Sequence, residues 1–129
     1  MSMSKAVTNG IRIEVVSTYV PERSQPFRSY FFFSYHIRIT NEGTDPVKLI
    51  SRHWKIRDAM GSFQVVNGDG VVGEQPRILP GATFSYTSFC PLHAEFGIME
   101  GTYTMEYDDG SSFEAVIAPF RLMVPESLN

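Results

Sequence analysis

The stretch Phe31-Phe32-Phe33-Ser34-Tyr35-His36-Ile37-Arg38-Ile39 decides the fold class. Its odd positions are all apolar or aromatic, whereas its even positions become polar after Phe32. Successive side chains of a β-strand point to opposite faces, so this period of two predicts a strand with one buried and one wetted face.

The same alternation recurs along the chain, and helical periodicity is almost absent. It covers residues 11–15, 47–57, 99–107 and 112–117, and it resumes at 120–124 after Pro119 breaks the register. Turn-forming segments lie between the runs: Asn41-Glu42-Gly43, Ala59-Met60-Gly61, Asn67-Gly68, Pro80-Gly81 and Asp108-Asp109-Gly110. Asp-Gly tolerates the backbone angles of tight hairpins, so the last of these predicts one.

About seven or more short antiparallel strands at this spacing predict an all-β sandwich of two sheets, with a small closed barrel as the alternative. The only tryptophan, Trp54, is expected to point inward with Ile50 and Ile56 and to anchor the core. Cys90 follows an aromatic run and precedes Pro91, which favours a partly buried structural thiol.

Size and composition predict one domain over residues 1–129. Hydrophobic residues make up 43% of the chain, and no stretch is long and apolar enough to cross a membrane. The formal net charge of −3 gives no overall attraction for nucleic acid or an anionic membrane. With no secretory signal at the N-terminus and a single cysteine, the expected location is cytoplasmic.

A basic stripe is the first candidate site. With Trp54 facing inward, the opposite face of its strand carries His53, Lys55 and Arg57, which could receive an anion or an acidic partner; a solvated sheet face is the alternative. Arg52 shares the inward parity of Trp54. A buried charge needs a partner, and parity alone suggests Glu74.

The stretch Gly68-Asp69-Gly70-Val71-Val72-Gly73 is the second candidate site, because it fits the G-x-G-x-x-G spacing of a dinucleotide-binding turn. That motif requires a helix after its third glycine, whereas Glu74, Gln75 and Pro76 follow here. The expected structure is instead a long inter-strand loop, which shapes the sandwich or binds a protein. The alternative is an anion held by successive backbone N–H groups.

Metal and catalytic sites are not predicted. Cys90 and His93 have a C-x-x-H spacing, but His36 and His53 are isolated in sequence, so a transition-metal site would require all three histidines to converge in space. No nucleophile lies in an activating context and no pair of carboxylates is placed for acid and base roles. We therefore expect a protein without enzymatic activity, metal or cofactor.

Several separated segments of the sequence together resemble the bacterial ApaG family: Arg52-His53-Trp54, Gly70 to Pro76, Pro80-Gly81, Phe84-x-Tyr86-x-Ser88, Gly97-x-Met99-x-Gly101-x-Tyr103 and the closing Phe120-Arg121-Leu122. The resemblance implies a fibronectin type III-like β-sandwich in the bacterial cytosol. Similar domains in eukaryotic F-box proteins and in a polymerase-delta-interacting protein are regarded as interaction modules. Family naming also implies a link to cobalt resistance and magnesium efflux. His93-Ala94-Glu95-Phe96 departs from the family's usual loop.

The function expected from these observations is a non-enzymatic module that binds an unidentified protein partner. It would use an exposed sheet face, a free strand edge or the loop over residues 68–76. The alternative is weak binding of an anion or a nucleotide pyrophosphate at Gly68, Gly70, Gly73 and Glu74 with help from His53, Lys55 or Arg57.

Overall fold

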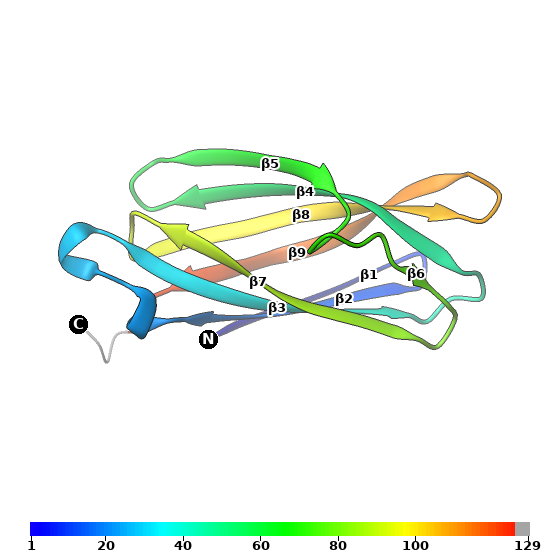
Figure 1. The fold of residues 1–129 in the computed structure, drawn as a ribbon, viewed down its shortest axis with the longest axis horizontal. Helices are drawn as coiled ribbons and strands as arrows, with labels where there is room; N and C mark the ends of the chain where they lie inside the picture. Colours follow the sequence, from blue (N-terminus) through cyan, green and yellow to red (C-terminus); the bar gives the residue numbers. More distant parts are fainter. Residues whose placement is uncertain (126–129) are drawn as a thin grey trace.

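The computed structural model describes residues 1–125 and consists of nine β-strands and two short 3-10 helices (Figure 1). The elements are β1 (Ser2–Thr8), β2 (Ile11–Tyr19), η1 (Pro21–Arg23), η2 (Pro26–Arg28), β3 (Phe31–Asn41), β4 (Val47–Asp58), β5 (Phe63–Asp69), β6 (Arg77–Ile78), β7 (Thr83–Leu92), β8 (Phe96–Tyr107) and β9 (Ser112–Met123). Among the described residues, no helix has the length and hydropathy needed to cross a membrane.

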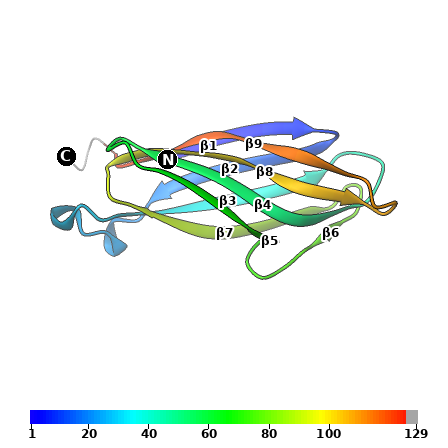
Figure 2. The same cartoon turned by 90° about the horizontal axis from the view of Figure 1, so that it is seen from above.

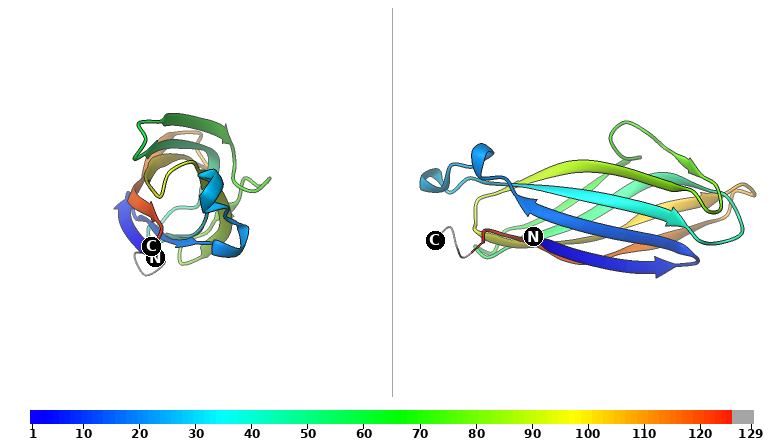
Figure 3. Two further views of the ribbon diagram at one scale, coloured as in Figure 1. Left: turned by 90° about the vertical axis from the view of Figure 1, so that its left-hand side faces the viewer. Right: turned by 90° about the horizontal axis from the view of Figure 1, so that it is seen from below.

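The strands form two antiparallel sheets that face each other across the core, which confirms the predicted β-sandwich. The order is β1-β2-β3-β7 in one sheet and β5-β4-β8-β9 in the other, with β6 paired to the start of β4. The view along the long axis shows the two sheets on either side of the core (Figure 3, left). The closer resemblance to fibronectin type III stays a prediction.

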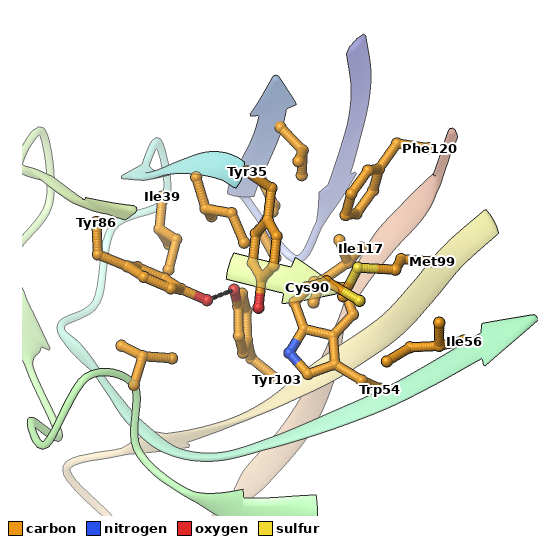
Figure 4. Packing of buried hydrophobic residues seen from close by; sticks show 14 of the residues in the cluster. Tyr35, Ile39, Trp54, Ile56, Tyr86, Cys90, Met99, Tyr103, Ile117 and Phe120 are labelled. Carbon is orange, nitrogen blue, oxygen red and sulfur yellow. Dashed lines mark hydrogen bonds between the residues drawn. The ribbon is translucent and has the colours of Figure 1, made fainter. Parts of the chain in front are cut away.

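Trp54 anchors the core, as the sequence predicts. Its side chain is 3% exposed. Its ring lies edge-on to Tyr35, Tyr103 and Phe120 at centroid distances of 5.5, 6.3 and 5.9 Å (Figure 4). Edge-to-face contacts at these distances suit the charge distribution of aromatic rings. Trp54 therefore links β3 of one sheet to β8 and β9 of the other.

The inward orientation predicted for Ile50 is wrong, because β4 contains a bulge. The pairing register of β4 with β8 shifts between Leu49 and Ser51. The extra residue reverses the alternation of the strand. The odd-numbered Val47 and Leu49 face the core before the bulge, and the even-numbered Trp54 faces it after the bulge. Ile50 is only half-buried at the shift.

Two strands differ from the sequence-based expectations and one hairpin agrees with them. Asn67-Gly68, predicted as a turn, lies inside β5. The first strand, β1, lacks strong hydrophobic alternation and was not predicted. The Asp108–Gly110 hairpin is confirmed: it joins β8 to β9, and Gly110 has φ +88°.

The two long sides of the sandwich differ. On one side, β1 lies beside β9, where Ser4 Oγ donates to Ala118 O at 2.9 Å and Arg121 N donates to Ser2 Oγ at 3.1 Å. The other side is bordered by β7 and β5 (Figure 2). Within residues 1–125 no hydrogen bond joins those two strands. The sandwich is therefore closed along β1 and β9 and open along β7 and β5.

Candidate functional site

The open side contains a groove of about 440 Å³ between β5 and β7. One wall of the groove comes from β4 and β5 and the other from β7, and buried core side chains form the floor. Its lining includes Arg52, Trp54, Ile56 and Asp58 from β4, Gln64 and Val66 from β5, Phe89, Cys90 and Pro91 from β7, and Tyr35 from β3. The groove thus combines aromatic and aliphatic side chains with polar ones, and its β4 wall carries one cation and one anion.

Cys90 lies on the groove floor near Trp54 (Figure 4) and is 6% exposed, so its predicted burial is confirmed. Burial disfavours the thiolate and raises the pKa of the Cys90 thiol to about 11. At neutral pH this group is protonated, and a protonated thiol is a poor nucleophile. Cys90 therefore contributes apolar surface to the groove.

Arg52 is held by backbone carbonyls, and its predicted pairing with Glu74 is wrong. Arg52 Nη1 donates to Asp69 O and Gly70 O, each at 2.9 Å. The guanidinium reaches these atoms because it lies over Gly68, where a Cβ would come within 2.7 Å of Cζ. Among residues 1–125 the ion pairs are Arg12–Glu42, His53–Glu114 and Arg77–Asp108.

The basic stripe lies on the outer face of β4, as parity predicts, but its members do not converge. His53 Nε2 is 3.8 Å from the Glu114 carboxylate. The Arg57 guanidinium stands 5.6 Å from the centre of the Phe63 ring. Lys55 is exposed. Since nearby groups already engage two of the three side chains, binding of an anion by the stripe stays a prediction.

The glycine-rich segment after β5 folds into a tight turn. The N–H of Gly70 donates to a carbonyl of β4 at 2.8 Å, and Val71 and Glu74 exchange two backbone hydrogen bonds of 2.8 and 2.9 Å. Between them Val72 and Gly73 have φ of +43° and +81°. Positive φ at both central residues is the pattern of a type I′ turn. The G-x-G-x-x-G spacing here builds a hairpin turn.

This turn lies next to Arg52, at one end of the groove. Val71 is 1% exposed and belongs to the core, while Glu74 is exposed. Three of the backbone N–H groups in residues 70–74 already donate within the protein, which leaves few for an anion. The turn adjoins Arg52, on the face of β4 opposite the basic stripe. Anion or nucleotide binding here stays a prediction.

The histidines do not converge. His36 lies on the outer face of the four-stranded sheet, where it bonds to Thr87, and His53 lies on the outer face of the other sheet. His93 follows β7 and contacts Ser29 O at 3.2 Å. Within residues 1–125 no three His, Cys, Asp or Glu side chains are grouped to hold a metal ion.

The free edge of β5 follows from its pairing with β4. Asp58 N donates to Ser62 O at 3.1 Å at one end, and Gly70 N donates to Ile50 O at 2.8 Å at the other. Residues of an antiparallel strand alternate between its two neighbours, so the even residues of β5 face β4. The N–H and C=O groups of Phe63, Val65 and Asn67 therefore face outward, in an uninterrupted row.

The edge of β7 differs. Asn41 N donates to Ala82 O at 3.0 Å, so the even residues of β7 face β3 and the odd ones face outward. Pro91 is one of these odd residues and has no N–H. A proline on the free side of an edge strand discourages another strand from pairing there.

Exposed apolar side chains accompany the β5 edge. Phe63, Val65 and Val66 are 55%, 56% and 38% exposed. The glycines predicted a turn at Asn67-Gly68 and a long loop after Val65-Val66, whereas β5 continues to Asp69. The apolar–polar alternation of Phe63, Gln64 and Val65 stops at Val66, so it was too short to predict the strand.

The fold and site define a small β-sandwich protein with one closed side and one open side, where a groove meets a free strand edge. The chain belongs to the ApaG domain family, whose model matches residues 21–107. It is 57% identical over 127 residues to Protein ApaG of Anaeromyxobacter dehalogenans, covering 98% of this chain and 100% of that one. It is 55% identical over 123 residues to Protein ApaG of Methylobacterium nodulans, covering 95% of each.

A solved structure agrees with this assignment. The crystal structure described as the ApaA protein from Bordetella pertussis matches with a TM-score of 0.87 and 46% sequence identity. The match covers 90% of this chain and 94% of that one. The family resemblance and the sandwich fold predicted from the sequence are thus confirmed.

Proposed function

We propose that this protein is a non-enzymatic module that binds a protein partner by adding an extended segment of that partner to the free edge of β5. The observation that carries the proposal is the row of outward-facing backbone groups at Phe63, Val65 and Asn67 beside a groove that contains apolar side chains. Strand addition supplies affinity through such groups, and adjoining pockets supply specificity.

The other edges support this choice. Pro91 interrupts the donor row of β7, and β1 and β9 are joined by hydrogen bonds that involve serine side chains. Natural proteins protect edge strands with proline, charge or cover. The edge of β5 instead exposes Phe63 and Val65, which is typical of a surface that a partner covers.

We propose a cytoplasmic setting and a protein partner in preference to nucleic acid. The formal net charge of −3 supports the latter choice, since nucleic-acid binding relies on positive charge. Any link to cobalt or magnesium would then act through the bound partner.

The test is capture by crosslinking in extract of the source bacterium, comparing wild type with Val65→Pro. Val65 N–H faces outward, so proline there removes an edge donor without removing a bond to β4. Ser85→Pro is the matched control, because Ser85 occupies the equivalent free-edge position on β7. We expect wild type and Ser85→Pro to retain the same partner and Val65→Pro to lose it. Equal capture by all three would count against strand addition at β5.

A further inference from the structure

We propose that the groove accepts an extended segment that places a carboxylate beside Arg52 and, two residues away, an apolar side chain over Trp54. This inference rests on strand addition at β5 and adds the chemistry of the segment that binds. It commits to a partner peptide with one acidic and at least one apolar residue on the same face.

The β4 wall of the groove has a fixed order of side chains. Every second residue faces the groove, giving Arg52, Trp54, Ile56 and then Asp58. Strands rise about 3.3 Å per residue, so roughly 20 Å separate the backbone positions of Arg52 and Asp58. The β4 wall thus has a positive end, the apolar Trp54 and Ile56 between, and a negative end, which favours one orientation of a charged segment.

Among residues 1–125, no carboxylate pairs with the charge of Arg52. Within the described part of the chain, Arg52 is in no ion pair, and its guanidinium donates to the carbonyl oxygens of Asp69 and Gly70. Both bonds use Nη1, whereas a guanidinium has five N–H donors. A carboxylate that reaches the remaining donors forms charge-assisted hydrogen bonds, which are stronger than neutral ones.

Gly68 sets the register. Arg52 lies directly opposite Gly68, and because Gly68 has no Cβ the guanidinium lies over the β5 backbone. A residue of the added strand that faces Gly68 comes next to this guanidinium. The next residue on the same face lies opposite Val66, which pairs with Trp54, and so enters the apolar part of the groove.

Asp58 excludes the opposite placement. Its Oδ1 accepts hydrogen bonds from Met60 N at 2.8 Å and Ser62 N at 3.1 Å, so the carboxylate is held at its end of the groove. A peptide carboxylate there would face a like charge. The acidic residue of the partner therefore belongs at the Arg52 end.

The experiment uses four acetylated and amidated heptapeptides. Two carry the acid, Thr-Glu-Thr-Phe-Thr-Val-Thr and the reversed order Thr-Val-Thr-Phe-Thr-Glu-Thr, and two have Gln in place of Glu. The pair of orders allows for either strand direction. Binding is followed by the fluorescence of Trp54, the only tryptophan, and by calorimetry. We expect one Glu peptide to bind about tenfold more tightly than its Gln counterpart.

The protein variants separate the contribution of the contact with Arg52 from the contribution of strand addition. Arg52→Gln should bind the Glu and Gln peptides equally, at the affinity that wild type shows for the Gln peptide, which also shows that the variant folds. Arg38→Gln is the matched control and should leave the tenfold preference intact, since Arg38 lies on the other sheet. Val65→Pro should weaken the binding of the Glu and Gln peptides to the same extent.

The outcomes are distinguishable. Equal binding of Glu and Gln peptides to wild type, with both lost in Val65→Pro, would overturn the carboxylate assignment and leave strand addition standing. Binding that persists in Val65→Pro would overturn both. If no peptide binds and wild type instead forms a dimer that Val65→Pro abolishes, a second copy of the chain occupies the groove. If no peptide binds and no dimer forms, the inference about the carboxylate is overturned. Strand addition is then tested separately by the capture of a partner from extract.

Discussion

The guanidinium of Arg52 lies against the backbone of Gly68, where a Cβ would approach Cζ to 2.7 Å. The absence of a side chain at Gly68 allows Arg52 to cross β5 and bond to Asp69 O and Gly70 O. The glycine-rich segment that the sequence offered as a candidate site and the inward-facing Arg52 are therefore parts of one arrangement. This arrangement determines where positive charge lies in the groove.

Gly68→Ala tests this relationship. We expect the free energy of unfolding to fall by about 1–2 kcal/mol, because the added methyl displaces Arg52 from its two carbonyl acceptors. Urea unfolding followed by Trp54 fluorescence gives the value. In an Arg52→Ala background the same change should be neutral or stabilising, since Ala suits a strand interior better than Gly. Equal destabilisation in both backgrounds would contradict the coupling.

Val72→Asn should stabilise the protein. Val72 has φ +43° in an exposed type I′ turn, and the left-handed region costs a non-glycine residue about 1–2 kcal/mol. Asn tolerates these angles and Asn-Gly is favoured in such turns, so we expect a gain of about 1 kcal/mol and a melting temperature a few degrees higher. Gly73→Ala is the matched control at φ +81° and should destabilise. A lower melting temperature for Val72→Asn would contradict this account.

The sequence predicts the buried strands well because each has one face in the core. The odd residues of Phe31–Ile39 are all buried, and period two follows directly from burial on one side. The same logic failed at Ile50, because a bulge changes parity without any distinctive residue to mark it.

The candidate site was less predictable from the sequence, because it depends on how the edge strands β5 and β7 of the two sheets lie relative to each other. β5 is exposed along most of its length, so no alternation of burial was available to separate it from a loop. Parity correctly placed Arg52 inward, yet it could not identify the acceptors, because the carbonyls of Asp69 and Gly70 become reachable only through the contact at Gly68.

Tyr86→Phe should destabilise more than its small chemical change suggests. The hydroxyls of Tyr86 on β7 and Tyr103 on β8 hydrogen-bond to each other between the two sheets (Figure 4), and Tyr103 is 0% exposed. Removing one hydroxyl leaves the other buried without its partner, at a cost of about 1–3 kcal/mol. The measurement is urea unfolding of Tyr86→Phe, Tyr103→Phe and the double variant. The double variant should lose less than the two single losses combined, and strict additivity would argue against a direct bond.

Alkaline conditions should weaken the fold. Burial raises the pKa of the Cys90 thiol from 9.0 to about 11 and also raises the pKa values of Tyr35, Tyr86 and Tyr103. A group whose pKa is higher in the folded state contributes its full stability below the unfolded pKa. The unfolded thiol loses its proton first as pH rises, so the contribution of Cys90 falls between pH 9 and 11.

Urea unfolding at several values from pH 8 to 11 measures this loss, and Cys90→Ala isolates the thiol. The wild-type free energy of unfolding should fall over this range by on the order of 2 kcal/mol more than that of Cys90→Ala, which retains the tyrosines. A thiol-specific reagent at pH 8 should react slowly with the folded wild type and rapidly in urea, because the protonated Cys90 is buried beneath the groove. Parallel pH profiles for the two proteins, or rapid labelling of the folded state, would show that Cys90 is ionised or accessible and that the groove floor is more open than Trp54 and Tyr35 make it here.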